Sequence, residues 1–247
     1  MIEILPLTDI GEVLPGSDLA AVLIAALNEA RIEPTAGDVL VVTQKIVSKA
    51  ENRFADLSAV VPGERAVALA KQTGKDPRLV ELVLSESSEV LRSVPNVLIT
   101  RQRAGHVMAN AGIDRSNIGS ATGEQALLLP EDSDASAERL WVSLGKRCAV
   151  VISDSFGRPW RHGVVNVAIG VAGMPSLIDR RGDLDRDGRR LEVTQIALGD
   201  MIATAAGLAM GEGAEGVPAA LIRGVRWSGP NSPASALVRP LEEDLFR

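Results

Sequence analysis

Residues 149–173, AVVISDSFGRPWRHGVVNVAIGVAG, join a buried strand to a group of chemically useful side chains. The apolar, β-branched residues at the start of this stretch are typical of a strand that is covered on both faces. Asp154 and Ser155 follow at the expected end of the strand, and three basic side chains come next: Arg158, Arg161 and His162. A carboxylate and a hydroxyl suit a hard divalent cation, and arginine suits phosphate or carboxylate oxygens. The pattern favours phosphoryl chemistry, although an Asp-Ser turn that closes a core strand would explain the same residues.

Strand-like and helix-like segments mix on both sides of this stretch without a regular βαβ alternation. Strands are expected at 2–7, 38–49, 97–101, 107–113, 149–155 and 217–225. Helices are expected from Ser17 or Asp18 to Ala30 and at 64–73, 77–85, 135–147 and 194–210. A polar loop is expected over 114–134, and a turn-rich tail with a charged end follows residue 225. These segments predict an α+β fold of mixed sheets and helices in one domain, 1–247.

The composition excludes several classes of protein. The 247 residues carry 26 basic and 32 acidic side chains, a net charge of −6, whereas nucleic-acid binding needs a basic surface. Cys148 is the single cysteine and there are two histidines, His106 and His162, so neither a disulfide framework nor a Cys-rich or His-based metal site is expected. No secretory signal precedes the first strand, and the weakly polar stretch 163–178 is interrupted by Asn166 and Pro175. We therefore expect a cytoplasmic protein with no membrane partner.

The glycines of 211–216 (GEGAEG) match G-x-G-x-x-G, but a helix is expected before them and a strand after them. A dinucleotide-binding fingerprint requires the opposite order, so a Rossmann fold is not expected. A flexible loop that approaches a phosphate, with Glu212 or Glu215 available to a metal, and a simple glycine C-cap both stay open. Neither G-x-x-x-x-G-K-[ST] nor G-x-S-x-G occurs, which argues against a P-loop and a nucleophile-elbow hydrolase.

Asp183, Asp185, Asp187 and Gly188 imitate the start of a calcium loop. The twelfth position holds Thr194, where a bidentate Glu is needed, so a solvated Asp/Arg loop is the better interpretation.

Asp114 and Asn117 follow the apolar residues 106–113 much as Asp154 follows its strand. Two aspartates at two strand ends can converge on a metal if the strands are neighbours. The competing interpretation of Asp114 is an Asx-turn. Lys49 and Glu51 suggest a phosphate-reaching lysine with a partner, or an ordinary strand end.

Five motifs in this order resemble the coenzyme F420-0:L-glutamate ligase family, the γ-glutamyl ligases of deazaflavin biosynthesis. They are VVTQKIVSKAE (41–51), NAGIDRSN (110–117), LLLPEDSDASAE (127–138), the opening stretch 149–173, and MGEGAEGVPA (210–219). The resemblance extends over about residues 4–225. In some relatives a flavin reductase domain follows the ligase domain, and no such domain is expected in this chain.

The resemblance implies a GTP-dependent ligase that uses two divalent cations, Mn²⁺ or Mg²⁺. GTP would phosphorylate the lactyl carboxylate of the precursor F420-0, and the amine of L-glutamate would attack the acyl phosphate. A second cycle would extend the product through a γ-glutamyl linkage. A carboxylate becomes an acyl donor only when its oxygen becomes a good leaving group, and metals neutralise the charge that gathers on phosphate.

The resemblance also implies particular site residues. The metal ligands would be Asp114, Asp154, Ser155 and Glu212, of which both aspartates would be catalytic. The GTP contacts would be Ile10, Gly11, Glu12, Val13, Gln44, Lys45, Lys49, Asn117, Met210, Gly211, Glu212, Gly213, Ala214, Glu215, Gly216 and Val217. From charge and position alone, Arg158, Arg161 and His162 are expected to hold the phosphodiester or carboxylates of the substrate.

This chain departs from the family pattern in the nucleotide cradle, where Gln44 and Lys45 stand at positions at which some relatives carry small hydroxyl residues, and IGEV (10–13) replaces a turn that contains Leu-Pro. An altered nucleotide preference is one consequence that stays open. The resemblance implies a homodimer of two-subdomain protomers that intertwine, and it leaves open the choice of metal, a requirement for K⁺ and the number of glutamates added. The alternatives are an amide ligase for another carboxylate and a non-catalytic deazaflavin or nucleotide-binding protein.

Overall fold

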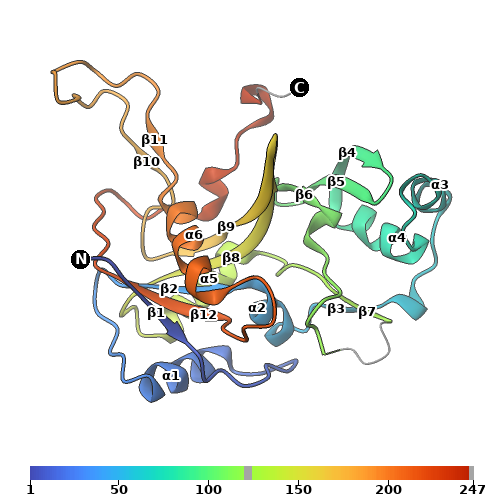
Figure 1. Cartoon of the computed structure of the whole chain (residues 1–247), viewed down its shortest axis with the longest axis horizontal. Helices are drawn as coiled ribbons and strands as arrows, with labels where there is room; N and C mark the ends of the chain where they lie inside the picture. Colours follow the sequence, from blue (N-terminus) through green and yellow to red (C-terminus); the bar gives the residue numbers. More distant parts are fainter. Residues whose placement is uncertain (120–123, 245–247) are drawn as a thin grey trace.

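A five-stranded sheet organises the larger of two lobes in the computed structural model, which describes residues 1–119 and 124–244 (Figure 1). The expected loop over 114–134 includes residues 120–123, and the charged end of the tail includes 245–247; both pieces lie outside the described residues. Helices accompany several separate mixed and antiparallel sheets, so the α+β prediction is confirmed.

The strand order of this sheet is β1 (Glu3–Leu7), β12 (Ala219–Arg223), β2 (Val39–Thr43), β8 (Ala149–Arg158) and β9 (Arg161–Ala172). Strands β2 and β8 run parallel, and the other neighbouring pairs are antiparallel. The central strands are buried on both faces, which explains why they are continuous apolar runs with no alternation of polar residues.

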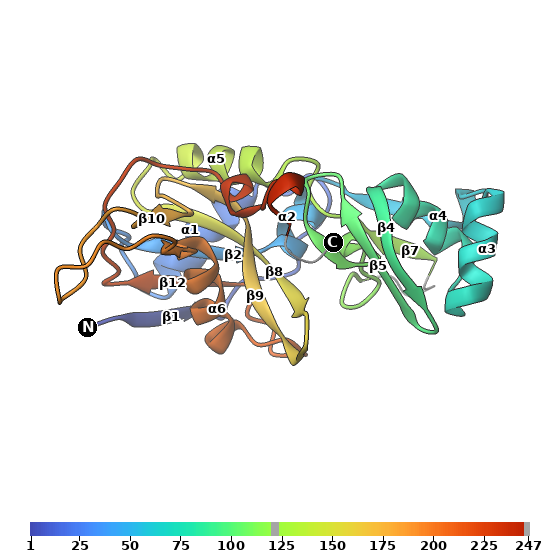
Figure 2. The same cartoon turned by 90° about the horizontal axis from the view of Figure 1, so that it is seen from above.

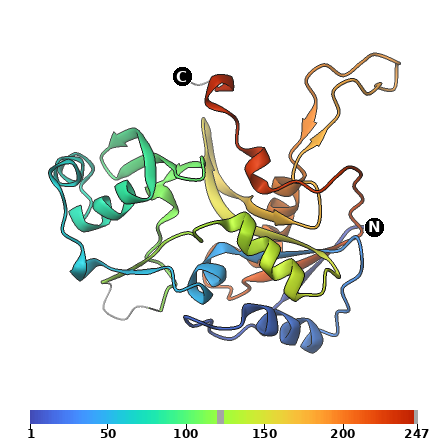
Figure 3. The ribbon, with the colours of Figure 1, turned by 180° about the vertical axis from the view of Figure 1, so that it is seen from behind.

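Helices cover the two faces of this sheet. Helices α1 (Leu19–Glu29) and α5 (Ser133–Ser143) pack on one face, and α6 (Leu198–Met210) packs on the other (Figures 2 and 3). The side chain of Asp18 accepts a hydrogen bond from the Ala21 N–H, which confirms Asp18 as the N-cap of α1. Each helix therefore shields one face of the buried strands from water.

The smaller lobe is inserted between β2 and β8. Its elements are β3 (Phe54–Asp56), α3 (Glu64–Thr73), α4 (Pro77–Ser85), β4 (Ser87–Val94), β5 (Val97–Gln102), β6 (Val107–Ala109) and β7 (Gln125–Leu127). These elements enclose an apolar cluster of their own, which contains Leu57, Val80 and Leu98. The chain leaves the larger lobe after α2 (Gln44–Ala50) and returns to it before α5, so the larger lobe is built from two separate parts of the sequence.

The remaining elements are short. A two-stranded hairpin of β10 (Ile178–Asp179) and β11 (Gln195–Ile196) carries the projecting loop 180–194 (Figure 1). In this loop Arg180 pairs with Asp183, and Asp185 accepts the backbone N–H groups of Asp187 and Arg189. Single 3-10 turns lie at Leu57–Ala59, Asn110–Gly112, Ala234–Leu237 and Leu241–Glu243.

The structure corrects several expected boundaries. The strand expected over 38–49 ends at Thr43, and Gln44–Ala50 is helix α2. Strand β4 was not expected, because its sequence SSEVLRSV has few apolar residues and depends on pairing with β5. Strand β7 interrupts the expected loop 114–134, and the helix expected over 194–210 begins at Leu198.

The strand of the opening stretch also runs further than expected. Asp154 and Ser155 lie inside β8 and not at its end, because β9 folds back beside β8 as far as the Arg158–Arg161 pair. No helix in the described residues combines the length and apolar character that crossing a membrane requires.

Candidate active site

The carboxyl end of the parallel pair β2 and β8 provides an open edge of the sheet. Thr43, the last residue of β2, pairs with Ser153, so Asp154 and Ser155 continue past the end of the neighbouring strand. Ligands in open α/β sheets bind at such carboxyl ends, because the side chains and backbone groups there are not covered by a neighbouring strand. Successive residues of a strand point to opposite faces, so Asp154 and Ser155 reach to the two sides of this edge.

Asp154 faces the edge as a half-buried carboxylate. Burial raises the pKa of Asp154 to about 7; the Ser155 backbone N–H and the charge of Lys45 lower it, whereas the charges of Asp114 and Glu212 raise it further. The like charges of Asp114 and Glu212 therefore act on Asp154, although these three described carboxylates do not lie close enough together to hold a metal ion as they stand. The local excess of negative charge is the environment that a divalent cation neutralises.

Asp114 lies beside the first turn of α2. Its Oδ2 atom is 2.7 Å from Lys45 Nζ, and its Oδ1 atom accepts hydrogen bonds from the Ser116 backbone N–H and hydroxyl, both at 2.8 Å. Burial alone would raise the pKa of Asp114, but these bonds from Lys45 and Ser116 hold it below its ordinary value. The hydrogen bond from the Ser116 backbone N–H to the Asp114 side chain is that of an Asx-turn. Asp114 therefore forms the expected turn and also lies at the candidate site.

Ser155 and Glu212 meet on the other side of the edge. The Ser155 hydroxyl donates to Glu212 Oε2 at 2.5 Å, and the side-chain amide of Asn166 donates to Glu212 Oε1 at 3.0 Å. The same amide nitrogen is 3.2 Å from Ser155 Oγ. Asn166 was not among the expected site residues; a polar residue within the apolar run of β9 was the available signal.

Two lysines of α2 reach neighbouring loops. Lys45 Nζ also donates to the Ser116 carbonyl at 3.0 Å, and Lys49 Nζ lies 2.6 Å from Glu12 Oε1. The Lys49 side chain is almost fully buried, whereas that of Glu12 is 64% exposed. Through these two lysines, α2 is joined to loop 10–13 and to the turn after Asp114.

The glycine-rich loop 211–216 closes the arrangement. The order is helix α6, glycines, strand β12, which confirms that this is not a dinucleotide-binding fingerprint. Gly211 adopts φ +74, and a Cβ atom there would lie 2.3 Å from the Glu215 side chain, so the turn requires glycine. Asn117 donates to the Gly213 carbonyl at 3.2 Å, which joins the loop to the turn after Asp114.

Several residues expected to contact GTP have side chains in the protein interior. Gln44 is buried and accepts a hydrogen bond from the Ser48 hydroxyl within α2. Val13 and Met210 are buried, and Ile10 and Val217 pack against the two apolar clusters of the larger lobe. The side chains of Gln44, Val13 and Met210 are therefore buried in this arrangement, whereas those of Ile10 and Val217 stay partly exposed.

Arg158, Arg161 and His162 lie at the tip of the β8–β9 hairpin (Figure 1). Arg158 Nη2 donates to the His162 carbonyl at 2.9 Å, and the side chains of Arg161 and His162 are exposed. Arg158 lies four residues beyond Asp154, about 13 Å along the strand. These three side chains therefore lie further along the hairpin than Asp154 and Ser155.

The fit to metal ions follows from the donor set. In the part of the chain that the structure describes, no three acidic, histidine or cysteine side chains already lie close enough together to hold a metal ion. Asp114 already pairs with Lys45, and Glu212 already accepts hydrogen bonds from Ser155 and Asn166. The candidate ligands nonetheless all offer oxygen atoms, which is the donor chemistry that Mg²⁺ or Mn²⁺ requires. Among the described ion pairs, none involves Asp154.

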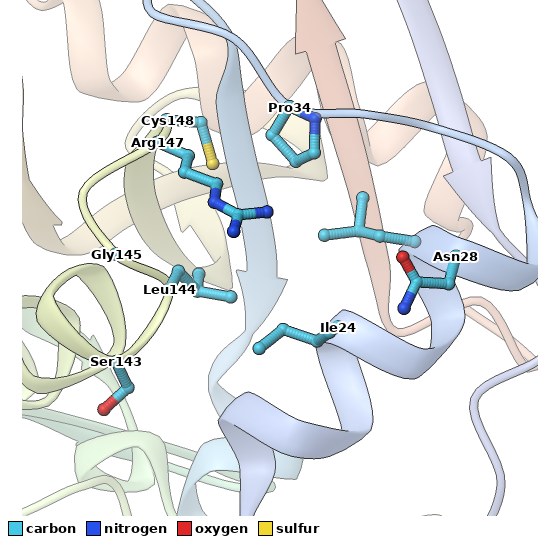
Figure 4. Close-up of a pocket in the computed structure, with 9 residues that line it drawn as sticks. Ile24, Asn28, Pro34, Ser143, Leu144, Gly145, Arg147 and Cys148 are labelled. Carbon is cyan, nitrogen blue, oxygen red and sulfur yellow. The ribbon is translucent and has the colours of Figure 1, made fainter.

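A separate pocket of about 190 Å³ lies between α1 and α5 (Figure 4). Ile24, Leu27, Leu144 and Cys148 are part of its lining. Cys148 directly precedes β8, six residues before Asp154, so this pocket belongs to the opposite end of the strand. It does not contribute to the edge where the carboxylates gather.

Comparison with known proteins gives a consistent result. A family profile described as F420-0:Gamma-glutamyl ligase matches residues 8–224. The chain is 45% identical over 238 residues to coenzyme F420:L-glutamate ligase of Methanothermobacter thermautotrophicus, covering 94% of this chain and 93% of that protein. It is 44% identical over 245 residues to the protein of the same name from Methanopyrus kandleri, covering 96% and 94% of the two chains. The protein of that name from Archaeoglobus fulgidus is 41% identical over 251 residues and covers 100% and 96%.

Proposed function

The chain belongs to the F420-0:Gamma-glutamyl ligase family, and from this premise we propose that it is a GTP-dependent ligase that adds L-glutamate to coenzyme F420-0. One observation carries the proposal: Lys45, Asp114, Asp154, Ser155 and Glu212 come from four distant segments and gather at one open sheet edge. A protein that only bound a nucleotide would not need two buried or half-buried aspartates beside a glutamate. The named relatives support the substrates, and the site supports the chemistry.

The first half-reaction is a phosphoryl transfer. A carboxylate oxygen of F420-0 attacks the γ-phosphorus of GTP, the bond to the β-phosphate oxygen breaks, and an acyl phosphate and GDP result. Lys45 and Lys49 stabilise the negative charge on the phosphates, once each lysine has left its present carboxylate partner. The backbone N–H groups of loop 211–216 supply further donors to phosphate oxygens.

Asp114, Asp154, Ser155 and Glu212 are the residues that would hold two divalent cations. Bound there, Mn²⁺ or Mg²⁺ would screen the charge that gathers on the transferred phosphoryl group. Asp114 is freed for this role when Lys45 turns to the nucleotide.

The second half-reaction forms the amide. The neutral amine of L-glutamate attacks the acyl carbon, inorganic phosphate leaves, and the amine gives up a proton, so one GTP is consumed for each glutamate. Repetition on the γ-carboxyl of the added glutamate gives a γ-glutamyl linkage. Arg158, Arg161 and His162 are kept as groups that would hold the phosphodiester or carboxylates of a long substrate that extends toward the hairpin tip.

The two lobes form one catalytic domain in this proposal, because the site draws Asp114 from the returning end of the inserted segment and the other ligands from the larger lobe. The chain is proposed to work as a homodimer in the cytoplasm, with K⁺ as a further cation to test.

The test is mass spectrometry of F420-0 after incubation with the protein, GTP, L-glutamate and Mn²⁺ or Mg²⁺, with each component omitted in turn. A product heavier by one or more glutamyl units, formed only when all components are present, is the expected result. GTP consumption with unchanged F420-0 would point to another carboxylate substrate. No turnover at all would favour a binding protein.

A further inference from the structure

Asn166 lies directly opposite Ser155 in the β8–β9 pairing and is 7% exposed. Its amide nitrogen donates to two different proposed metal ligands, Glu212 Oε1 at 3.0 Å and Ser155 Oγ at 3.2 Å. An amide nitrogen has two hydrogens, so both bonds form at the same time. Asn166 therefore links a strand ligand to a ligand from the loop after α6.

Helix α6 holds Asn166 in place from the other side. The Thr204 hydroxyl donates to the Asn166 backbone carbonyl at 2.7 Å. Gly207 lies one turn further along, and a Cβ atom at this position would be 1.8 Å from Asn166 Oδ1. A glycine costs about 1 kcal/mol in a helix interior relative to alanine, so its presence here needs a reason, and the approach of the Asn166 amide provides one.

We infer that Asn166 is a positioning residue that holds Ser155 and Glu212 in the arrangement a divalent cation needs, and that Gly207 makes room for it. This inference rests on the proposed function. Asn166 occupies Glu212 Oε1 and leaves Oε2, which now accepts the Ser155 hydroxyl, as the oxygen to be offered to the cation. When the Ser155 hydroxyl turns its hydrogen away from Glu212, Ser155 Oγ and Glu212 Oε2 would both be available to the same cation.

The amide is chemically suited to this role. It donates without carrying charge, so it orients Glu212 without cancelling the negative charge that attracts the cation. A lysine or arginine at this position would neutralise Glu212. Outer partners of this kind typically change metal affinity 10- to 100-fold when removed.

The experiment measures Mn²⁺ binding by the electron paramagnetic resonance signal of free Mn²⁺, with the full chain and no other substrate. Asn166→Ala is expected to weaken Mn²⁺ binding about 10-fold or more. Thr204→Val is the matched control, because it removes a bond to the backbone of the same residue and leaves the amide in place; its Mn²⁺ affinity is expected to stay within about twofold of wild type. Thermal midpoints of both variants report any loss of folding separately.

Gly207→Ala supplies a second test that leaves every proposed ligand intact. In the wild-type background it should weaken Mn²⁺ binding by displacing the amide, and in the Asn166→Ala background it should have no further effect. Equal Mn²⁺ affinity of wild type and Asn166→Ala would overturn the inference, as would a full additional loss from Gly207→Ala in the double variant. Wild-type protein that binds no Mn²⁺ would overturn the metal site of the proposed function itself, a result distinct from either of these.

Discussion

Lys45 Nζ lies 2.7 Å from Asp114 Oδ2, so a side chain proposed to bind phosphate neutralises a side chain proposed to bind metal. Both partners must separate before either can meet its ligand. Binding of metal to Asp114 releases Lys45 for the nucleotide, and binding of the nucleotide releases Asp114 for the metal. Such an exchange makes the two binding events favour each other by the same factor.

Lys45→Met is expected to strengthen Mn²⁺ binding several-fold in the absence of GTP, because it removes a competing cation from Asp114. It should also weaken GTP binding and abolish the mutual strengthening between Mn²⁺ and GTP. Titration calorimetry of each ligand, alone and with the other present, measures these effects. Lys49→Met is the control, since Lys49 pairs with Glu12, which is not a proposed metal ligand. This variant should weaken GTP binding without strengthening Mn²⁺ binding. Equal behaviour of the two variants would contradict the exchange.

Asp154→Asn is expected to reduce glutamyl transfer at least about 100-fold. The same change should stabilise the metal-free protein at pH 8 by about 1–3 kcal/mol, because burial raises the pKa of Asp154 to about 7 and its ionised form is therefore unfavourable in the folded state. The gain should be full above about pH 7, shrink as the pH falls from about 7 to about 4, and vanish at still lower pH, where both states carry a neutral carboxyl. Urea unfolding with a chelator present, at several pH values, measures this. Full activity of the variant would refute the role of Asp154.

Local patterns predict two helices of the smaller lobe to the residue. Asp76 and Pro77 begin α4, and Gly74 ends α3 in the left-handed conformation; both helices coincide with the expected ranges 64–73 and 77–85. Helix α2 could not be found in the same way. Thr43 makes no capping hydrogen bond to α2, and the apolar residues on both sides of it continue the pattern of β2. Contacts made by α2 with the rest of the larger lobe decide its conformation.

The site depends on contacts between segments that are far apart in the sequence. Lys45 and Ser116 are 71 residues apart, and Ser155 and Glu212 are 57 apart, so no local pattern can show that they meet. The family resemblance supplied Lys45, Ser155 and Glu212, whereas Ser116 was not among the expected site residues. Asn166 stands out in the sequence only as a polar residue within an apolar run, and the register that places it opposite Ser155 reveals its partners.

Asp38 directly precedes β2, at the end of the sheet opposite the candidate active site. It is 2% exposed and accepts hydrogen bonds from Arg223 and from the backbone and hydroxyl of Thr35. Burial alone would raise the pKa of Asp38, but these bonds hold it below its ordinary value, so its contribution to stability is present at neutral pH and is lost as the pH falls below 4. Asp38→Asn should cost about 1–3 kcal/mol at pH 7 and much less at pH 3 in urea unfolding. Asp179→Asn, which breaks an exposed pair with Arg181, should leave stability unchanged. An equal cost of Asp38→Asn at both pH values would exclude this linkage.

Cys148 offers a direct probe of the larger lobe away from the site. The thiol is 3% exposed at the edge of the pocket between α1 and α5 (Figure 4), and burial raises its pKa to about 11. A thiol needs to be both ionised and accessible to react, so native protein at pH 8 should resist iodoacetamide, whereas protein in denaturant should be modified at one site. Mass spectrometry of the intact chain counts the modifications.

The rate at which the native protein is modified should follow the rate at which the packing between α1 and α5 opens. This rate should rise in a variant such as Leu27→Ala, which removes part of that packing. Rapid modification of the folded wild-type chain would show that this packing is open in solution.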